Sequence, residues 1–109
     1  MLSQGDVNFQ KISRKRANEL HSSSSKRVSG GILKRGESTV HSHRLAVLED
    51  AELFDLGEDG RLHMVVVVGE RGCEVVHEEH GTIRLEPGQV YEITDDREYS
   101  DEGERPVAD

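Results

Sequence analysis

Four histidines in two close pairs are the side chains of this chain best suited to bind a metal ion. His41 and His43 form one pair, and His77 and His80 form the other. Neutral imidazole is the commonest protein ligand for divalent transition metals. If the two segments meet in the fold, we expect these four residues to hold a divalent transition metal, with Zn, Ni, Fe or Mn as the candidates.

The neighbours of the two pairs fit the same hypothesis. Alternate residues of a β-strand lie on one face, so His41 and His43 can point the same way. The carboxylates of Glu78 and Glu79 lie inside the second pair and can add oxygen ligands. Two alternatives stay open, which are a hydrogen-bonded histidine cluster without metal and unrelated surface positions.

Nothing else in the chain forms a known catalytic motif. His21 and His63 have no second histidine nearby in the sequence, and we expect neither to be a ligand. Cys73 is the only cysteine, so no intramolecular disulfide can form, and we expect a buried, inert thiol. A Cys–His nucleophile pair with His77 is disfavoured, because four residues of strand span roughly 13 Å. A Ser-His-Asp order, a phosphate loop and a CxxC pair are missing, which favours a protein that is not an enzyme.

Composition indicates a small domain with a thin aliphatic core. The chain has 109 residues, of which 33% are hydrophobic and 4% aromatic, without Trp. This length suits a single domain. So small a core is marginally stable alone, and a second copy, a partner or a metal would stabilise it. We therefore expect a homo-oligomer or a larger assembly.

Charge is spread unevenly along the chain. Residues 1–35 carry eight Lys/Arg and two acids, a net charge of +6, whereas residues 36–109 carry six Lys/Arg and twenty acids, a net charge of −14. The acidic part would repel phosphate, so we do not expect nucleic acid as a partner. The basic part suits an acidic protein partner, the chain's own acidic body or a polyanion, or it is simply a solvated, flexible segment.

Neither a membrane span nor a signal peptide is evident. The longest apolar run, residues 64–68, is far too short to cross a bilayer. The N-terminus lacks an apolar run after its charges, as a signal peptide would need. We expect a protein of the cytoplasm, or of a virus particle if a phage encodes it.

The elements that must position the histidines are short strands separated by turns. Residues 57–60, 69–72 and 86–89 are turn sequences between apolar runs. Residues 65–68 are four consecutive valines, which is typical of a strand buried on both faces. The pattern predicts an all-β fold, namely a small single-domain β-barrel or sandwich of about seven or eight short strands.

Three regions follow from these patterns. We expect residues 1–29 to hold an N-terminal strand and then a flexible, polar, basic arm that is rich in serine. A short helix over residues 14–21 has little support from the sequence. Residues 30–99 should form the β-barrel or sandwich body, and residues 100–109 an acidic C-terminal tail.

Four separated segments resemble a family of small uncharacterised β-domain proteins from bacteria and their phages. They are QGDV at residues 4–7, GES-HSHRL at residues 36–45, HEEHG-I-L-PG-Y at residues 77–91 and REYS…VAD at residues 97–109. The resemblance runs from end to end and implies one compact domain. The resemblance itself implies no activity. A small acidic all-β body with a mobile basic arm and no evident nucleophile predicts a structural module, which in a phage setting would decorate or cement a capsid.

A weaker resemblance is to the cupins, whose pattern is a Gly, a His-x-His pair, a Glu, and later a Pro-x-Gly turn followed by one more His. Gly36, the first histidine pair and Glu49 follow that order, and residues 81–88 read GTIRLEPG. The turn here lacks the intervening residue, and no His follows it. This resemblance implies the alternative function, a small cupin-like metalloenzyme.

The sequence thus predicts a non-catalytic structural or interaction module. Its basic N-terminal arm would dock on a protein partner, and its histidine cluster would bind a divalent metal. Capsid decoration or cementing in a phage-type virion is the specific form of this prediction.

Overall fold

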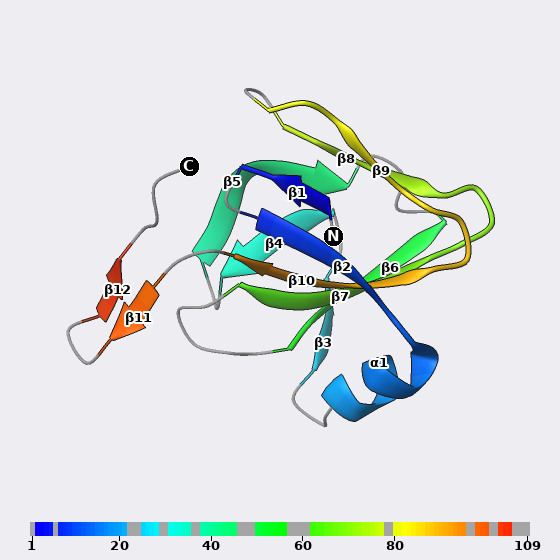
Figure 1. The fold of residues 1–109 in the computed structure, drawn as a ribbon, viewed down its shortest axis with the longest axis horizontal. Coiled ribbons are helices and arrows are strands. Elements are labelled where there is room, and N and C mark those ends of the chain that lie inside the picture. Colours follow the sequence, from blue (N-terminus) through cyan, green and yellow to red (C-terminus); the bar gives the residue numbers. More distant parts are fainter. Residues whose placement is uncertain are drawn as a thin grey trace.

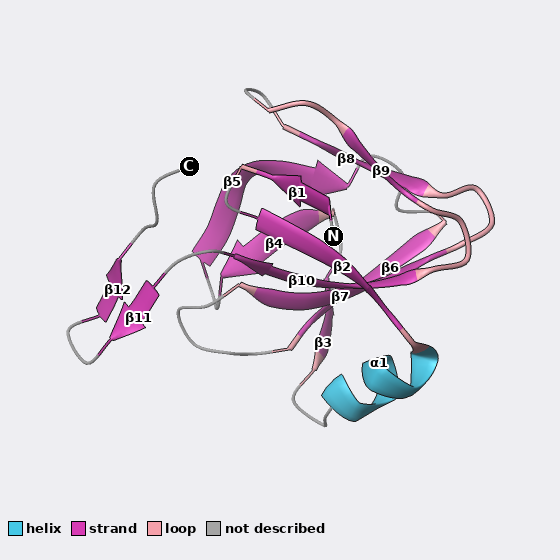
Figure 2. Cartoon of the chain, viewed as in Figure 1, coloured by secondary structure: helices cyan, strands magenta, loops and turns pink. Residues whose placement is uncertain are grey.

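Two antiparallel β-sheets, shown in Figure 1 and Figure 2, form the body of the structure, which is a computed structural model. It describes residues 2–5, 7–21, 25–28, 31–35, 38–45, 50–56, 62–77, 80–95, 98–100 and 103–105. Within these ranges ten strands build the two sheets: β1 (Leu2–Gln4), β2 (Val7–Ile12), β3 (Lys26–Val28), β4 (Ile32–Arg35), β5 (Ser38–Leu45), β6 (Ala51–Asp55), β7 (His63–Val68), β8 (Cys73–Val76), β9 (Ile83–Leu85) and β10 (Val90–Asp95).

The two sheets have different strand orders. The first sheet runs β1-β2-β10-β7-β6-β3, and the second runs β4-β5-β8-β9. Helix α1 (Arg14–Leu20) lies against the outer face of the first sheet (Figure 1). The strands β11 (Glu98–Ser100) and β12 (Gly103–Arg105) pair with each other and lie apart from both sheets in Figure 1. The acidic tail expected over residues 100–109 thus contains β12.

The hydrophobic core lies between the two sheets. Alternation along β2 and β10 turns Phe9 and Ile93 inward, where they are fully buried. Met64 and Val66 of β7 join them, and Val75 of the second sheet packs from the other side. Burial of these aliphatic and aromatic side chains, at roughly 1.5–3 kcal/mol each, is the main stabilising contribution to the sandwich.

Strand β7 is buried on both faces, as the valine run predicts. Val66 faces the core between the sheets, while Val65 faces α1 on the outer side of the first sheet, and both are fully buried. Ala17 of α1 packs in the second cluster with Val65 and Val90. The first sheet is therefore covered on one side by the second sheet and on the other by α1.

The N-terminal part of the chain differs from the flexible arm expected over residues 13–29. Ser13 caps α1, because its hydroxyl accepts a hydrogen bond of 3.0 Å from the Arg16 N–H. Ala17 is buried against the sheet, and Val28 of β3 is buried and pairs with Leu53 of β6. A helix of about two turns and one short strand carry too few apolar residues for a periodic signal, so the sequence pattern favours a polar arm. Residues 22–24 lie outside the described residues.

The predicted fold class is confirmed: the chain is a small, single-domain, all-β protein with a sandwich-like body. It has more strands than expected, because Gly5, at φ 60°, breaks the first strand into the β1–β2 hairpin and because β3 arises inside the expected arm. Cys73 is buried, as expected. Among the described residues, no helix is long and apolar enough to span a membrane.

Replacement of Val66 by Asp should destabilise the protein by at least about 3 kcal/mol, because it buries an unpaired carboxylate between the sheets. Urea unfolding followed by circular dichroism measures the change. Gln10→Asp, at an exposed position of β2, is the matched control and should cost within about 1 kcal/mol. Equal effects of the two substitutions would contradict the central place of β7.

Candidate functional site

The four predicted histidine ligands lie on neighbouring segments of the second sheet. His41 and His43 belong to β5, and His77 and His80 belong to the turn between β8 and β9. The β5–β8 ladder pairs Arg44 with Val76. One further step along this antiparallel register sets His43 opposite His77 at the level of the backbone. The side chains of β5 lie outside the described part of the structure, as do Glu78 and Glu79.

The His77–His80 turn is closed by its own histidines. The His80 N–H donates a hydrogen bond of 3.0 Å to Nδ1 of His77. The two rings lie 4.6 Å apart, centroid to centroid, at an angle of 45°. A neutral imidazole whose Nδ1 accepts a hydrogen bond carries its proton on Nε2. In this conformation, therefore, His77 offers no lone pair to a metal ion unless the His80 N–H is displaced.

The described residues contain no ready-made metal centre. Among them, no three or more side chains of His, Cys, Asp or Glu gather closely enough to hold a metal ion. His77 and His80 form a pair within that set. His77 and His80 are joined by a hydrogen bond between the backbone of one and the ring of the other, and a metal there requires His41 or His43 as well.

The N-terminal hairpin is fastened to this turn. Gln4 is 2% exposed, and its Nε2 amide donates hydrogen bonds of 2.9 Å to the carbonyl oxygens of Val75 and Gly81. The ring of His80 lies directly against Gly5, where an added Cβ would be 2.7 Å from Nε2. The two carbonyls flank the His77–His80 turn, so Gln4 links the first sheet to the second at the candidate site.

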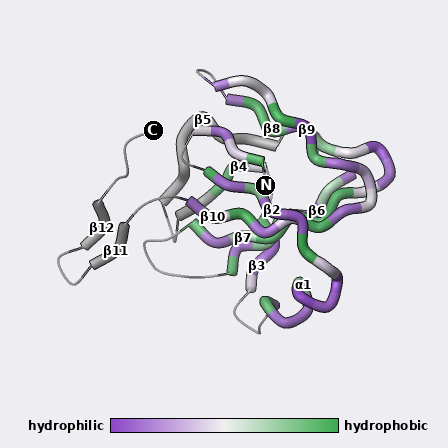
Figure 3. The backbone as a smooth tube through the Cα atoms, viewed as in Figure 1, coloured by the Kyte–Doolittle hydropathy of each residue, from purple (hydrophilic) through white to green (hydrophobic). Residues whose placement is uncertain are grey.

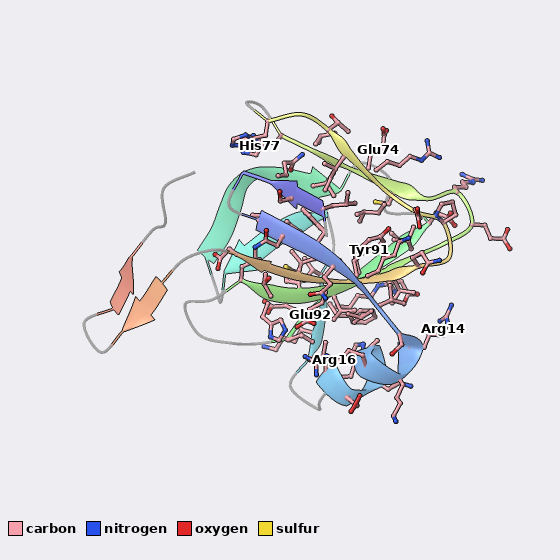
Figure 4. The ribbon with its side chains drawn as sticks, viewed as in Figure 1. Arg14, Arg16, Glu74, His77, Tyr91 and Glu92 are labelled. Atoms are coloured by element: carbon pink, nitrogen blue, oxygen red, sulfur yellow. The ribbon has the colours of Figure 1, made fainter. Side chains whose placement is uncertain are left out.

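A second polar cluster joins α1 to the first sheet. Nε2 of His63 lies 2.7 Å from Oε2 of Glu92, and Nη2 of Arg16 lies 3.7 Å from Oε1 of the same carboxylate. The side chains of His63 and Glu92 are 15% and 16% exposed. Figure 4 shows Arg16 on α1 and Glu92 on β10. Sequence reasoning missed this cluster, because only the pairing of β7 with β10 brings His63 near Glu92.

A groove of about 510 Å³ opens between β2 and β9. Its lining residues are Leu2, Phe9, Gln10, Lys11, Arg84, Glu86 and Tyr91. An ion pair between Lys11 and Glu86 crosses it, and the hydrogen bond that the Lys11 ammonium donates to the Glu86 carboxylate raises the pKa of Lys11. Below this pair, the Tyr91 hydroxyl accepts a hydrogen bond of 2.9 Å from the Glu86 N–H. No local sequence pattern indicates this groove, because its walls are 70 or more residues apart.

Comparison with known proteins identifies a family. The sequence model of the family described as "Domain of unknown function (DUF8820)" matches residues 3–96. No curated protein and no solved structure matches the chain. The matched range takes in both sheets, α1 and all four candidate histidines.

Replacement of Gly5 by Ala should destabilise the protein by about 1–3 kcal/mol, because φ of 60° is unfavourable for Ala and because the new Cβ displaces the His80 ring. Gly88→Ala is the matched control, since Gly88 has φ 74° and open space around it. In a His80→Ala background the cost of Gly5→Ala should fall to that of Gly88→Ala. Chemical unfolding of the wild type and the four variants measures this coupling, and perfectly additive effects would show that Gly5 and His80 do not interact.

Proposed function

The chain belongs to the DUF8820 family of domains of unknown function, and we propose that it is a non-catalytic structural module that acts by assembly with an acidic protein surface. The observation that supports this most is the anchoring of α1, the helix that carries several cationic side chains, against the first sheet. Arg14 and Lys15 are exposed, while Ala17 on the same helix is buried against the sheet. Arg16 is tied to Glu92. Figure 3 shows hydrophilic residues over most of α1.

Cationic side chains on an anchored helix suit docking better than those on a mobile arm do. Side chains carried on an anchored helix lose less conformational freedom on binding than those of a flexible segment. Lys26 and Arg27 of β3, also exposed, extend the positive charge beyond α1. Residues 36–109 carry a net charge of −14, so a second copy of this chain offers the complementary surface. We therefore propose that copies of this chain assemble through the basic face of α1, which is formed by the exposed side chains of Arg14 and Lys15.

The specific setting that we propose is a phage-type virion, in which the module decorates or cements a capsid. Its support is the resemblance of four segments of the sequence to small proteins of bacteria and their phages. A thin aliphatic core, which gains stability from association, is consistent with a protein that acts in an array.

Replacement of Lys15 by Glu should shift the protein toward the monomer, because it reverses a charge on the docking face. Native mass spectrometry and light scattering at low and high salt report the subunit count. Arg71→Glu, which makes the same charge change at an exposed turn of the second sheet, is the matched control and should leave assembly intact. High salt should also weaken assembly of the wild type. A wild-type protein that is monomeric at low salt would reject the proposal.

Metal binding is a second candidate function, and the register that sets His43 opposite His77 favours it. We propose that His41, His43, His77 and His80 bind a divalent transition metal, Zn, Ni, Fe or Mn, once the His80 N–H leaves Nδ1 of His77. Binding would therefore open the closed turn. The same metal would serve the alternative function, a cupin-like small metalloenzyme, if a substrate could reach it.

Titration with zinc should load about one ion per chain, and His41→Ala and His77→Ala should each weaken binding about tenfold or more, since each removes a ligand from a different segment. Hydrogen exchange of the His80 amide should accelerate on zinc binding, because that amide loses its acceptor. His63→Ala is the control and should bind zinc normally. Failure of the wild type to bind zinc in calorimetry would remove metal binding from the function.

A further inference from the structure

The two sheets approach each other along one side of the sandwich, where an edge strand of the first sheet contacts an edge strand of the second. We call this contact the seam. β1 is an edge strand of the first sheet, β9 is an edge strand of the second, and the two are in contact. Within the described residues no backbone ladder joins them. Side chains cross the seam instead, namely Gln4, which donates to the Gly81 carbonyl oxygen, and Lys11, which pairs with Glu86.

Both walls of the groove at this seam are strand edges without a neighbouring described strand. β1 pairs with β2 from Val7 to Phe9 only, which leaves the edge of β2 at Gln10, Lys11 and Ile12 open in the described structure. β9 pairs with β8 on one side, and its other edge faces the groove. Strand edges present N–H and C=O groups that accept a further strand readily.

The side chains around the groove select the kind of strand. Leu2, at the mouth, is 38% exposed, although the other large hydrophobic side chains of the described residues are more buried. Arg84 is exposed on β9, and its guanidinium makes no ion pair or hydrogen bond within the described part of the chain. The charge of Lys11, in contrast, is matched by Glu86. The groove therefore offers backbone edges, one apolar contact and the guanidinium of Arg84, which forms no ion pair within the described residues although Glu74 lies opposite it in the β8–β9 ladder.

We propose that this groove receives an extended, acidic peptide segment of a protein partner, which adds a strand beside β9 and places a carboxylate side chain against Arg84. Strand addition draws its affinity from main-chain hydrogen bonds and its specificity from alternate side chains. A carboxylate also forms charge-assisted, bidentate hydrogen bonds with a guanidinium. This site is separate from the basic face of α1 and does not depend on the assembly proposed above.

Two other occupants fit the groove less well. A small apolar ligand would find little surface, because Phe9 and Tyr91 on the floor are 0% and 1% exposed. A second copy that paired its β9 symmetrically with this β9, centred on Arg84, would set two guanidinium groups opposite each other, which is destabilising. An acidic strand from a different protein avoids both problems.

The test uses two blocked synthetic pentapeptides, Val-Thr-Glu-Thr-Val and Val-Thr-Lys-Thr-Val, titrated into the full chain and followed by amide chemical shifts. The glutamate peptide should bind the wild type, with shifts and slowed hydrogen exchange at Ile83–Leu85 and at residues 10–12. Arg84→Glu should weaken the glutamate peptide by about tenfold, the equivalent of about 1.4 kcal/mol, and should favour the lysine peptide instead. Arg71→Glu, an exposed charge reversal elsewhere, should leave both affinities unchanged.

Several results would overturn the proposal. The proposal fails if both peptides show no binding at millimolar concentration. It also fails if Arg84→Glu leaves the peptide preference unchanged, or if protection from hydrogen exchange is confined to residues outside the groove. Sodium propionate that competes at equal concentration would show a carboxylate site without strand addition. Lys15→Glu should leave peptide binding unchanged, so a failure of the assembly proposal and a failure of this one are distinguishable.

Discussion

Pairing of β2 with β10 is the contact on which the rest of the structure depends. Six residue pairs, from Val90 with Ile12 to Asp95 with Val7, join two strands that lie near opposite ends of the sequence that forms the sandwich. This ladder places the β1–β2 turn against the β8–β9 turn. Because α1 follows directly after β2, the ladder also positions the first turn of α1 beside the outer face of the first sheet. Without it, neither Gln4 nor Arg16 could reach the groups that they bind.

Two polar side chains, Gln4 and Glu92, hold the two sheets and α1 in one arrangement once β2 and β10 have paired. Gln4 satisfies two backbone carbonyl oxygens with one amide, so burying it leaves no donor of that amide unmatched. Glu92 receives His63 and Arg16 on its two oxygens, which holds the helix against its own sheet. A buried polar group without partners costs about 1–3 kcal/mol, so both side chains favour this one packing over alternatives.

Local patterns in the sequence predict the elements whose signals are local. The valine run from Val65 marks a strand buried on both faces, and the turns around Gly69 and Gly88 appear where glycine and proline place them. The helix is different, because α1 depends on Ser13 as a cap and on a sheet beneath Ala17 that the sequence does not reveal. Likewise, no pattern in the sequence shows that β2 and β10 are partners.

The candidate site divides in the same way. Histidine spacing identifies the residues, and the β5–β8 ladder ends one residue short of His43 and His77, but the use of the ring nitrogens follows from hydrogen bonding alone. Spacing cannot show that Nδ1 of His77 accepts the His80 N–H. Nor can it show that Gly5 lies under the His80 ring, because 75 residues separate them in the chain. The groove walls, also remote in sequence, are hidden for the same reason.

The β2–β10 ladder also sets the timing of folding on the ribosome. A chain grows at about 5–20 residues per second, so β2 waits about 4–18 s for a partner that is made 88 residues later, counted from Val7 to Asp95. Throughout that interval Val7 and Phe9 have no sheet to cover them. Of the two strands that pair with β2, only β1 is available during that interval, and it covers one edge of β2 from Val7 to Phe9. The first sheet can therefore be completed only after β10 has been made.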